Sequence, residues 1–131
     1  EVSIEAYENR KPGRLFTGRV SIEGGLSTGR RLPEKHEYLT RLRFTPDDGS
    51  SEIWVMNIGA HPNSLGGGNR MLSGEYPYFM REQIKAEKGA DVIFGIGAIG
   101  RIGWNLLRET AIMAALSPAN QTDFCLSDFC S

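Results

Sequence analysis

The sequence is poor in features that several large classes of protein require. Its longest apolar run covers residues 111–116, far short of the roughly 20 apolar residues of a membrane-spanning helix, so we expect no transmembrane segment. The first residues show no basic stretch followed by an apolar one, as a secretory signal would. With 15 basic and 16 acidic side chains, the net charge is -1. This balance provides no basic excess to attract nucleic acid, and we expect no nucleic-acid partner.

Cysteine and histidine are also scarce, with two of each among 131 residues. Cys125 and Cys130 are close enough in sequence to close a small disulfide loop, although two free thiols fit the sequence equally well. A structural zinc site at this place would need a second cysteine or histidine pair, which the sequence lacks. What is present, 40% hydrophobic and 24% charged residues, is typical of one soluble globular domain.

The chain divides into three parts by its patterns. Residues 1–37 are rich in glycine, proline and basic side chains, so we expect irregular structure with at most one short strand. Residues 38–116 carry stronger patterns and form the expected α/β core. Residues 117–131 are expected to form a tail. Together they are interpreted as a single domain or as a fragment of a larger one.

A β-hairpin is predicted at the start of the core. Thr40, Leu42 and Phe44 alternate with two arginines, and residues 46–49 (P-D-D-G) provide the chemistry of a turn. Residues 53–58 then place apolar side chains on both faces of a strand. Such a run is typical of a strand inside a sheet that is covered on each side.

Helices and strands alternate after the hairpin. A helix is predicted over residues 77–88, with Pro77 in its first turn and Gly89 after its end. A buried strand over 91–96 and a second helix over 104–116 follow. The predicted fold class is α/β: a β-hairpin plus a β-α-β-α unit forming a small mixed sheet flanked by helices, part of a larger α/β domain. If the two apolar strands are parallel neighbours, the loops after them meet at one edge of the sheet.

The most informative segment, N-I-G-A-H-P-N-S-L-G-G-G-N, puts His61 where a strand gives way to a glycine-rich loop. A lone histidine beside a proline is commonly a loop residue bonded to backbone, and His36 is the only other imidazole in the sequence. The glycines at 66–68 are either a flexible connector or a place where backbone approaches a ligand closely. Glu75 and Asp91 are candidate ligands or bases, or else a helix cap and a strand start.

Two glycine motifs in this region resemble nucleotide-binding signatures. Gly95, Gly97 and Gly100 fit the spacing G-x-G-x-x-G, but no further strand ending in an acidic residue follows the second predicted helix. The three consecutive glycines lack the Lys-Ser/Thr pair of a P-loop. We therefore expect no nucleotide cofactor.

A series of motifs follows in order along residues 30–100: a leucine-threonine strand, a D-G turn, the strand end N-I-G-A-H-P, the segment N-R-M-L-S-G-E-Y-P and the loop G-I-G-A-I-G. Together they resemble the middle of the N-terminal catalytic domain of the neutral/alkaline, non-lysosomal ceramidase family. The resemblance fades into a helix match through Leu116. It implies that His61, at the family's strand-end histidine, binds the catalytic zinc. With the glycines at 66–68, whose backbone can approach a ligand closely, the candidates for substrate or zinc-supporting contacts are Asn57, Gly66, Gly67, Gly68, Asn69, Gly100 and Asn105.

The chain departs from the family pattern at positions that matter for catalysis. The family completes its zinc site with an earlier histidine and with a glutamate and a tyrosine far downstream, and this sequence has no counterpart of these three. The family hexapeptide G-D-V-S-P-N matches residues 100–105, which read G-R-I-G-W-N. Arg101 stands in place of the aspartate and Gly103 in place of the serine.

The resemblance implies a zinc-dependent amide hydrolase that deacylates N-acyl sphingoid bases, incomplete or divergent in this chain. The expected cofactor is zinc, and the expected substrate is a lipid-like N-acyl amide. Other chain segments or a homo-oligomer would complete the site, and family members are often secreted or surface-associated. The alternative is a non-catalytic binding or assembly module on the same scaffold, which the positive charge of Arg101 favours.

Overall fold

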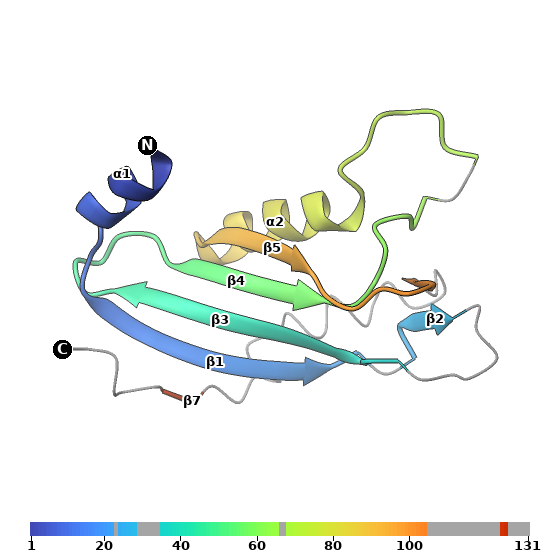
Figure 1. The fold of residues 1–131 in the computed structure, drawn as a ribbon, viewed down its shortest axis with the longest axis horizontal. Helices are drawn as coiled ribbons and strands as arrows, with labels where there is room; N and C mark the ends of the chain where they lie inside the picture. The colour runs from blue at the N-terminus through green and yellow to red at the C-terminus, as the bar shows by residue number, and fades with distance from the viewer. Residues whose placement is uncertain (23, 29–34, 66–67, 105–123, 126–131) are drawn as a thin grey trace.

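The computed structural model describes residues 1–22, 24–28, 35–65, 68–104 and 124–125. Figure 1 shows the elements within them. The helices are α1 (Val2–Glu8) and α2 (Glu75–Lys88). The strands are β1 (Gly13–Ser21), β2 (Leu26–Thr28), β3 (Tyr38–Pro46), β4 (Ile53–Ile58), β5 (Asp91–Ile96), β6 (Ile102–Trp104) and β7 (Phe124–Cys125). Neither of the two described helices is long and apolar enough to cross a membrane.

The larger strands form one mixed sheet in the order β5-β4-β3-β1-β7. Its neighbours are antiparallel except β4 and β5, which are parallel and are connected through α2. β2 and β6 pair separately as a short antiparallel ribbon. The fold is therefore the small mixed α/β sheet that the sequence predicts, and the parallel pairing of the two apolar strands is confirmed.

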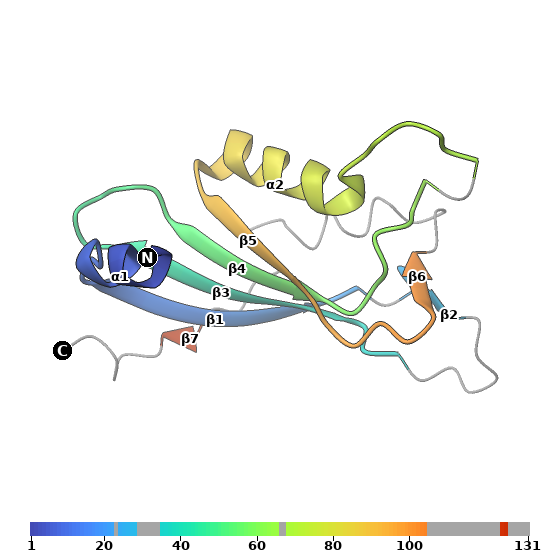
Figure 2. The same ribbon diagram turned by 45° about the horizontal axis from the view of Figure 1, so that its top comes forward.

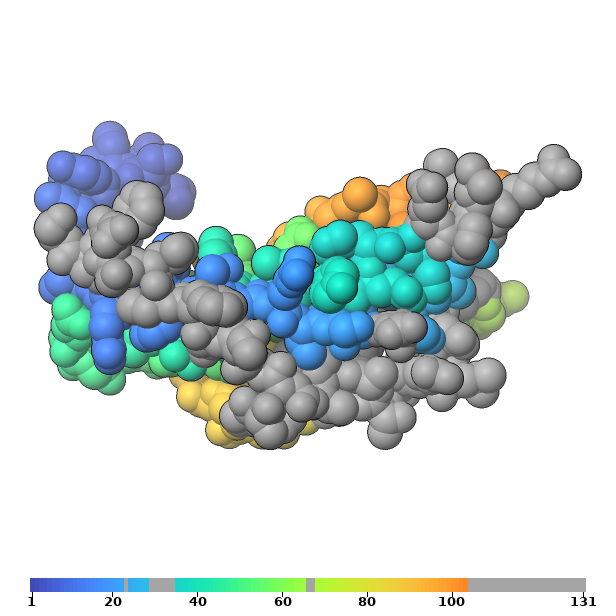
Figure 3. All heavy atoms as spheres, turned by 90° about the horizontal axis from the view of Figure 1, so that it is seen from below, coloured from blue at the N-terminus to red at the C-terminus, as the bar shows by residue number. Residues whose placement is uncertain are grey.

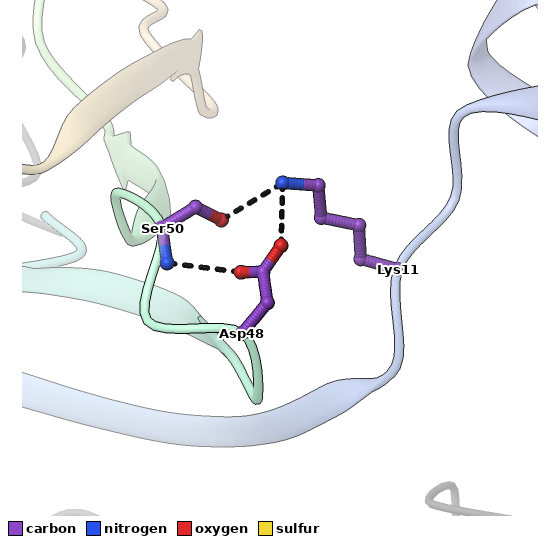
Figure 4. A network of polar contacts seen from close by, with 3 residues as sticks. All are labelled: Lys11, Asp48 and Ser50. Atoms are coloured by element: carbon purple, nitrogen blue, oxygen red, sulfur yellow. Dashed lines mark hydrogen bonds and ion pairs between the residues drawn. The ribbon is translucent and has the colours of Figure 1, made fainter.

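The predicted β-hairpin is formed by β3 and β4 in antiparallel register. Its turn includes Gly49, whose φ of 73° is easily adopted only by glycine. Asp48 forms an ion pair with Lys11 Nζ at 2.7 Å and accepts a hydrogen bond from the Ser50 N–H at 2.9 Å (Figure 4). The Lys11 ammonium and Ser50 hold the pKa of Asp48 well below its usual range. These contacts tie the hairpin turn to the segment that precedes β1.

The hydrophobic core lies between α2 and one face of the sheet. Tyr76, Met80 and Ile84 recur at helical spacing on α2, and all three are buried. The helix begins two residues before the predicted start at Pro77 and ends, as predicted, before Gly89, whose φ is 67°. The three side chains pack with apolar residues of the sheet and its turns: Ile22, Leu26, Leu39, Trp54, Met56, Ile58, Ala60, Ala90, Val92 and Ile102.

One prediction about β4 is wrong. The strand does lie inside the sheet, but its two faces differ: Trp54 is buried, whereas Ile53 and Val55 are each 39% exposed. The two faces of β3 differ in exposure in the same way. Arg41 is 3% exposed, and its guanidinium carbon lies 4.4 Å from the centre of the Trp54 ring. The arginine face is the buried one, since the stem and planar head of an arginine pack well on an aromatic ring.

The prediction of irregular structure over residues 1–37 is also wrong. α1 has 7 residues, and β1 has 9 residues that pair along their whole length with β3. Arginines and glycines interrupt the apolar residues of β1, so its local signal is weak, and pairing with a distant strand overrides it. The helix predicted over 104–116 lies outside the described residues except for Trp104, which ends β6. The proposed disulfide stays a prediction, because Cys130 lies outside the described residues.

Candidate functional site

The loops after β4 and β5 meet beside His61, as the predicted topology requires. The backbone N–H of His61 donates to the Ile102 carbonyl at 2.9 Å. The Gly97 N–H donates to the Ile58 carbonyl at 2.9 Å, so the two loops run side by side. Figure 2 shows both at the same end of the sheet, near β6. The prediction that the loops after β4 and β5 meet at the same end of the sheet is confirmed.

Two glycines allow this close approach. A Cβ on Gly59 would lie 2.8 Å from the Ala98 carbonyl oxygen, and a Cβ on Gly97 would lie 2.8 Å from Asn57 Oδ1. A carbon atom does not fit at such distances: a side chain at Gly59 would meet backbone and push the strand ends apart, and one at Gly97 would displace the Asn57 amide. The middle glycine of the G-x-G-x-x-G pattern therefore has a packing role between the two strand ends.

The first turn of α2 holds the loop after β4 at two further points. Tyr76 Oη donates to the Ala60 carbonyl at 2.9 Å, and this bond is buried. Glu75 Oε2 accepts hydrogen bonds from Ser64 Oγ at 2.7 Å and from the Leu65 N–H at 3.1 Å. Glu75 has a φ of 52°, a left-handed conformation that costs a residue other than glycine about 1–3 kcal/mol. The bonds to its carboxylate help to offset this strain, so Glu75 anchors the loop.

Sequence reasoning missed Tyr76 as part of this region. Its position on the apolar stripe of α2 marks it only as a core residue, and its partner is a backbone carbonyl 16 residues earlier in the chain. The signal that could have found it is the tyrosine of the segment S-G-E-Y-P at the start of α2. A tyrosine on the apolar stripe is expected to be buried, and a buried tyrosine hydroxyl usually has a hydrogen-bond partner.

The His61 side chain is half-buried on a fixed backbone. Besides the bond to Ile102, the His61 carbonyl accepts a hydrogen bond from the Asn63 N–H at 2.9 Å. The imidazole itself makes no hydrogen bond within the part of the chain that the structure describes. His36 is exposed, and its ring centre lies 5.6 Å from that of Tyr38. Of the two histidines, His61 is therefore the one that lies beside the end of β4. Its ring nitrogens have no described hydrogen-bond partner.

The two asparagines expected near the site have local structural partners. Asn57 Nδ2 donates to the Gly95 carbonyl at 3.1 Å and so joins the ends of β4 and β5. Asn69 makes two bonds of 3.0 Å to Met71, accepting from its N–H and donating to its carbonyl. The remaining candidates are two exposed glycines, Gly68 and Gly100, and three residues outside the described part of the chain, Gly66, Gly67 and Asn105.

The described residues supply the right kind of zinc donor but too few of them. They contain no group of three or more His, Cys, Asp and Glu side chains that could hold one ion. Asp91 pairs with Lys85 at 2.7 Å, and the carboxylate of Glu75 binds the loop, so both candidate carboxylates have other partners. A zinc site needs at least three protein ligands. The described residues therefore bring one candidate ligand, His61, to this place and do not form a zinc site by themselves.

Comparison with known proteins bears on the fold. No protein-family model matches the sequence, and no curated protein matches it. Among solved structures, the chain is similar to neutral ceramidase from Pseudomonas aeruginosa, with a TM-score of 0.59, 19% sequence identity, and coverage of 79% of this chain and 19% of that chain. A ceramidase complexed with C2 matches with a TM-score of 0.59, 18% identity and the same coverage, 79% and 19%. This chain thus spans about a fifth of the length of the solved ceramidases that it matches.

The likeness concerns the fold, because so low an identity does not transfer the roles of single residues. It agrees with the order of motifs along residues 30–100, which resembles the same family. The chain has the mixed α/β fold of one part of the larger neutral ceramidase structure.

Proposed function

We propose that this chain is part of a zinc-dependent amide hydrolase of the neutral ceramidase type, and that His61 is one of its zinc ligands. The substrate class is a lipid-like N-acyl amide, with N-acyl sphingoid bases as the first candidates. One observation carries the proposal: a half-buried imidazole without a described hydrogen-bond partner stands at the end of a central strand, in a fold similar to part of neutral ceramidase.

The role of the described residues is to hold this imidazole in place. A metal ligand needs a fixed backbone and a supporting shell. Three sets of hydrogen bonds provide this support. The His61 N–H donates to the Ile102 carbonyl, the Tyr76 hydroxyl donates to the Ala60 carbonyl, and the loop after His61 donates to the Glu75 carboxylate. When bound, zinc lowers the pKa of a coordinated water and polarises the amide carbonyl. The remaining ligands are proposed to come from further sequence or from other chains.

The test uses the full natural polypeptide that contains residues 1–131. His61→Ala is compared with His36→Ala, which removes an exposed imidazole. Loss of a supporting residue alone costs about 10–100-fold in metal affinity or activity. We therefore expect His61→Ala to lower zinc affinity and N-acyl sphingosine hydrolysis by at least about 100-fold, while His36→Ala keeps both. Metal titration gives the first value, and release of a fluorescent fatty acid gives the second.

Two results would contradict parts of this proposal. If His61→Ala keeps full zinc affinity and full hydrolysis, His61 is not a ligand. If the isolated 131-residue chain holds one zinc ion tightly as a monomer, the view that it lacks ligands is wrong.

The alternative is a non-catalytic binding or assembly module on the same scaffold. Arg101 favours it, because it is exposed in the turn before β6 and puts a positive charge where the family carries an aspartate. In that case the wild-type polypeptide binds no zinc and hydrolyses no N-acyl amide. His61→Ala then changes neither property, which separates the two functions.

A further inference from the structure

One face of the main sheet carries a continuous patch of exposed apolar side chains. Leu42, Val55 and Ile93 are neighbours across β3, β4 and β5, and they are 38%, 39% and 58% exposed. Ile53, two residues before Val55 on the same face of β4, is 39% exposed. We call these four residues the open face. α2 lies on the opposite side of the sheet, behind it in Figure 1 and below it in Figure 3.

The open face has the character of a buried surface. Its residues are β-branched or leucine, and they lie beside one another instead of being scattered singly among polar groups. Contiguous exposed apolar patches of this kind mark interaction surfaces in soluble proteins. Parallel strands such as β4 and β5 are also usually covered on both faces. The packing of α2 covers only one of the two faces.

α1 points to the same conclusion. It has 7 residues, none of them buried, and Val2, Ile4 and Tyr7 are 79%, 63% and 66% exposed. A helix this short is marginal in water unless its apolar side chains pack against something. Figure 3 shows α1 standing on the side of the sheet opposite α2, which is the side of the open face. α1 and the open face therefore lie on the same side of the sheet.

The edge of the sheet next to the open face is also unprotected. β5 is the outermost strand on this side of the described sheet. Its sequence, D-V-I-F-G-I, contains no proline or lysine, the residues that commonly block edge strands. Ile93 belongs both to this edge strand and to the open face, so the two exposed features are continuous.

We propose that the open face is the docking surface for a second apolar layer, formed by the remaining part of a larger α/β domain in the same polypeptide. The match to solved ceramidases favours this occupant, because it covers 79% of this chain but only 19% of those larger chains. Such a layer would lie on the same side of the sheet as the exposed helix α1. The proposal concerns packing and does not depend on zinc binding by His61.

The test is cysteine protection in the full natural polypeptide that contains residues 1–131. Val55→Cys places a thiol in the open face, and Met71→Cys places one in a loop where the native side chain is 79% exposed. Iodoacetamide modification of each is read by peptide mass spectrometry and normalised to its rate in urea. If the face were open, exposures of 39% and 79% would give rates that differ only about twofold. We expect Val55→Cys to react at least about tenfold more slowly.

Ile93→Cys repeats the measurement on β5 and guards against misfolding of one variant. Protection of both positions that is independent of protein concentration supports the proposal. Rates within about twofold of Met71→Cys at both positions would overturn it. Protection that appears only when the protein dimerises, as measured by sedimentation, would assign the open face to a second copy and would also overturn it. Loss of zinc or of hydrolysis in His61→Ala affects none of these outcomes.

Discussion

Replacing Tyr76 with phenylalanine tests whether its hydroxyl holds the loop after β4. The change keeps the ring, whose centre lies 5.7 Å from that of Phe94, and removes the donor to the Ala60 carbonyl. Ala60 is 0% exposed, so water does not readily replace the lost bond. A hydrogen bond contributes about 0.5–1.5 kcal/mol net, and a buried polar group left unsatisfied costs about 1–3 kcal/mol. We expect the free energy of unfolding to fall by about 1–2 kcal/mol.

Urea unfolding of the 131-residue chain, followed through tryptophan fluorescence to which the buried Trp54 contributes, measures this change. With a slope of about 1–3 kcal/mol per molar urea, the midpoint should fall by about 0.3–2 M. Tyr78→Phe is the matched control on the same helix, since Tyr78 is 51% exposed and its change should stay within about 0.5 kcal/mol. Equal midpoints for Tyr76→Phe and the wild-type chain would refute the reasoning.

Two further substitutions test the strand ends and the hairpin turn. Gly59→Ala should lower the free energy of unfolding by about 1–3 kcal/mol, because its Cβ would lie 2.8 Å from the Ala98 carbonyl oxygen. The control is Gly68→Ala, whose Cβ would have nothing within 4 Å. Equal stability of the two variants would contradict the packing role of Gly59. Asp48→Asn should flatten the acid dependence of stability, because Lys11 depresses the folded-state pKa of Asp48. The contribution of Asp48 is present above the unfolded pKa of about 3.9 and is lost progressively as pH falls from there toward the lower folded-state pKa. Thermal melts between about pH 6 and pH 3 check this, and parallel curves for the variant and the wild-type chain would rule it out.

Elements with local signals could be predicted from the sequence. The hairpin follows from the alternation along β3 and the P-D-D-G turn, and α2 follows from an apolar stripe that ends before Gly89. A strand, a helix and a second apolar strand in succession indicate a parallel crossover, because parallel neighbours need a long connection. That order alone places His61 at the end of a strand beside the loop that follows β5.

Features that depend on distant contacts could not be predicted in this way. β1 has a weak local signal and exists as a strand because β3 pairs with its whole length. The alternation on β3 predicts two different faces, but packing on Trp54 decides that the face with Arg41 is the buried one. The exposed positions of Ile53 and Val55 follow from the same choice.

The same division holds for the candidate site. The sequence by itself determined that a histidine stands at a strand end with glycines on both sides. Only the tertiary structure decided that its backbone is held by Ile102 and that Tyr76 and Glu75 clamp the loop around it. It also decided that Asp91 pairs with Lys85. The physical reason is that these bonds depend on the distances and burial of groups that lie far apart along the chain, which no linear spacing of residues contains.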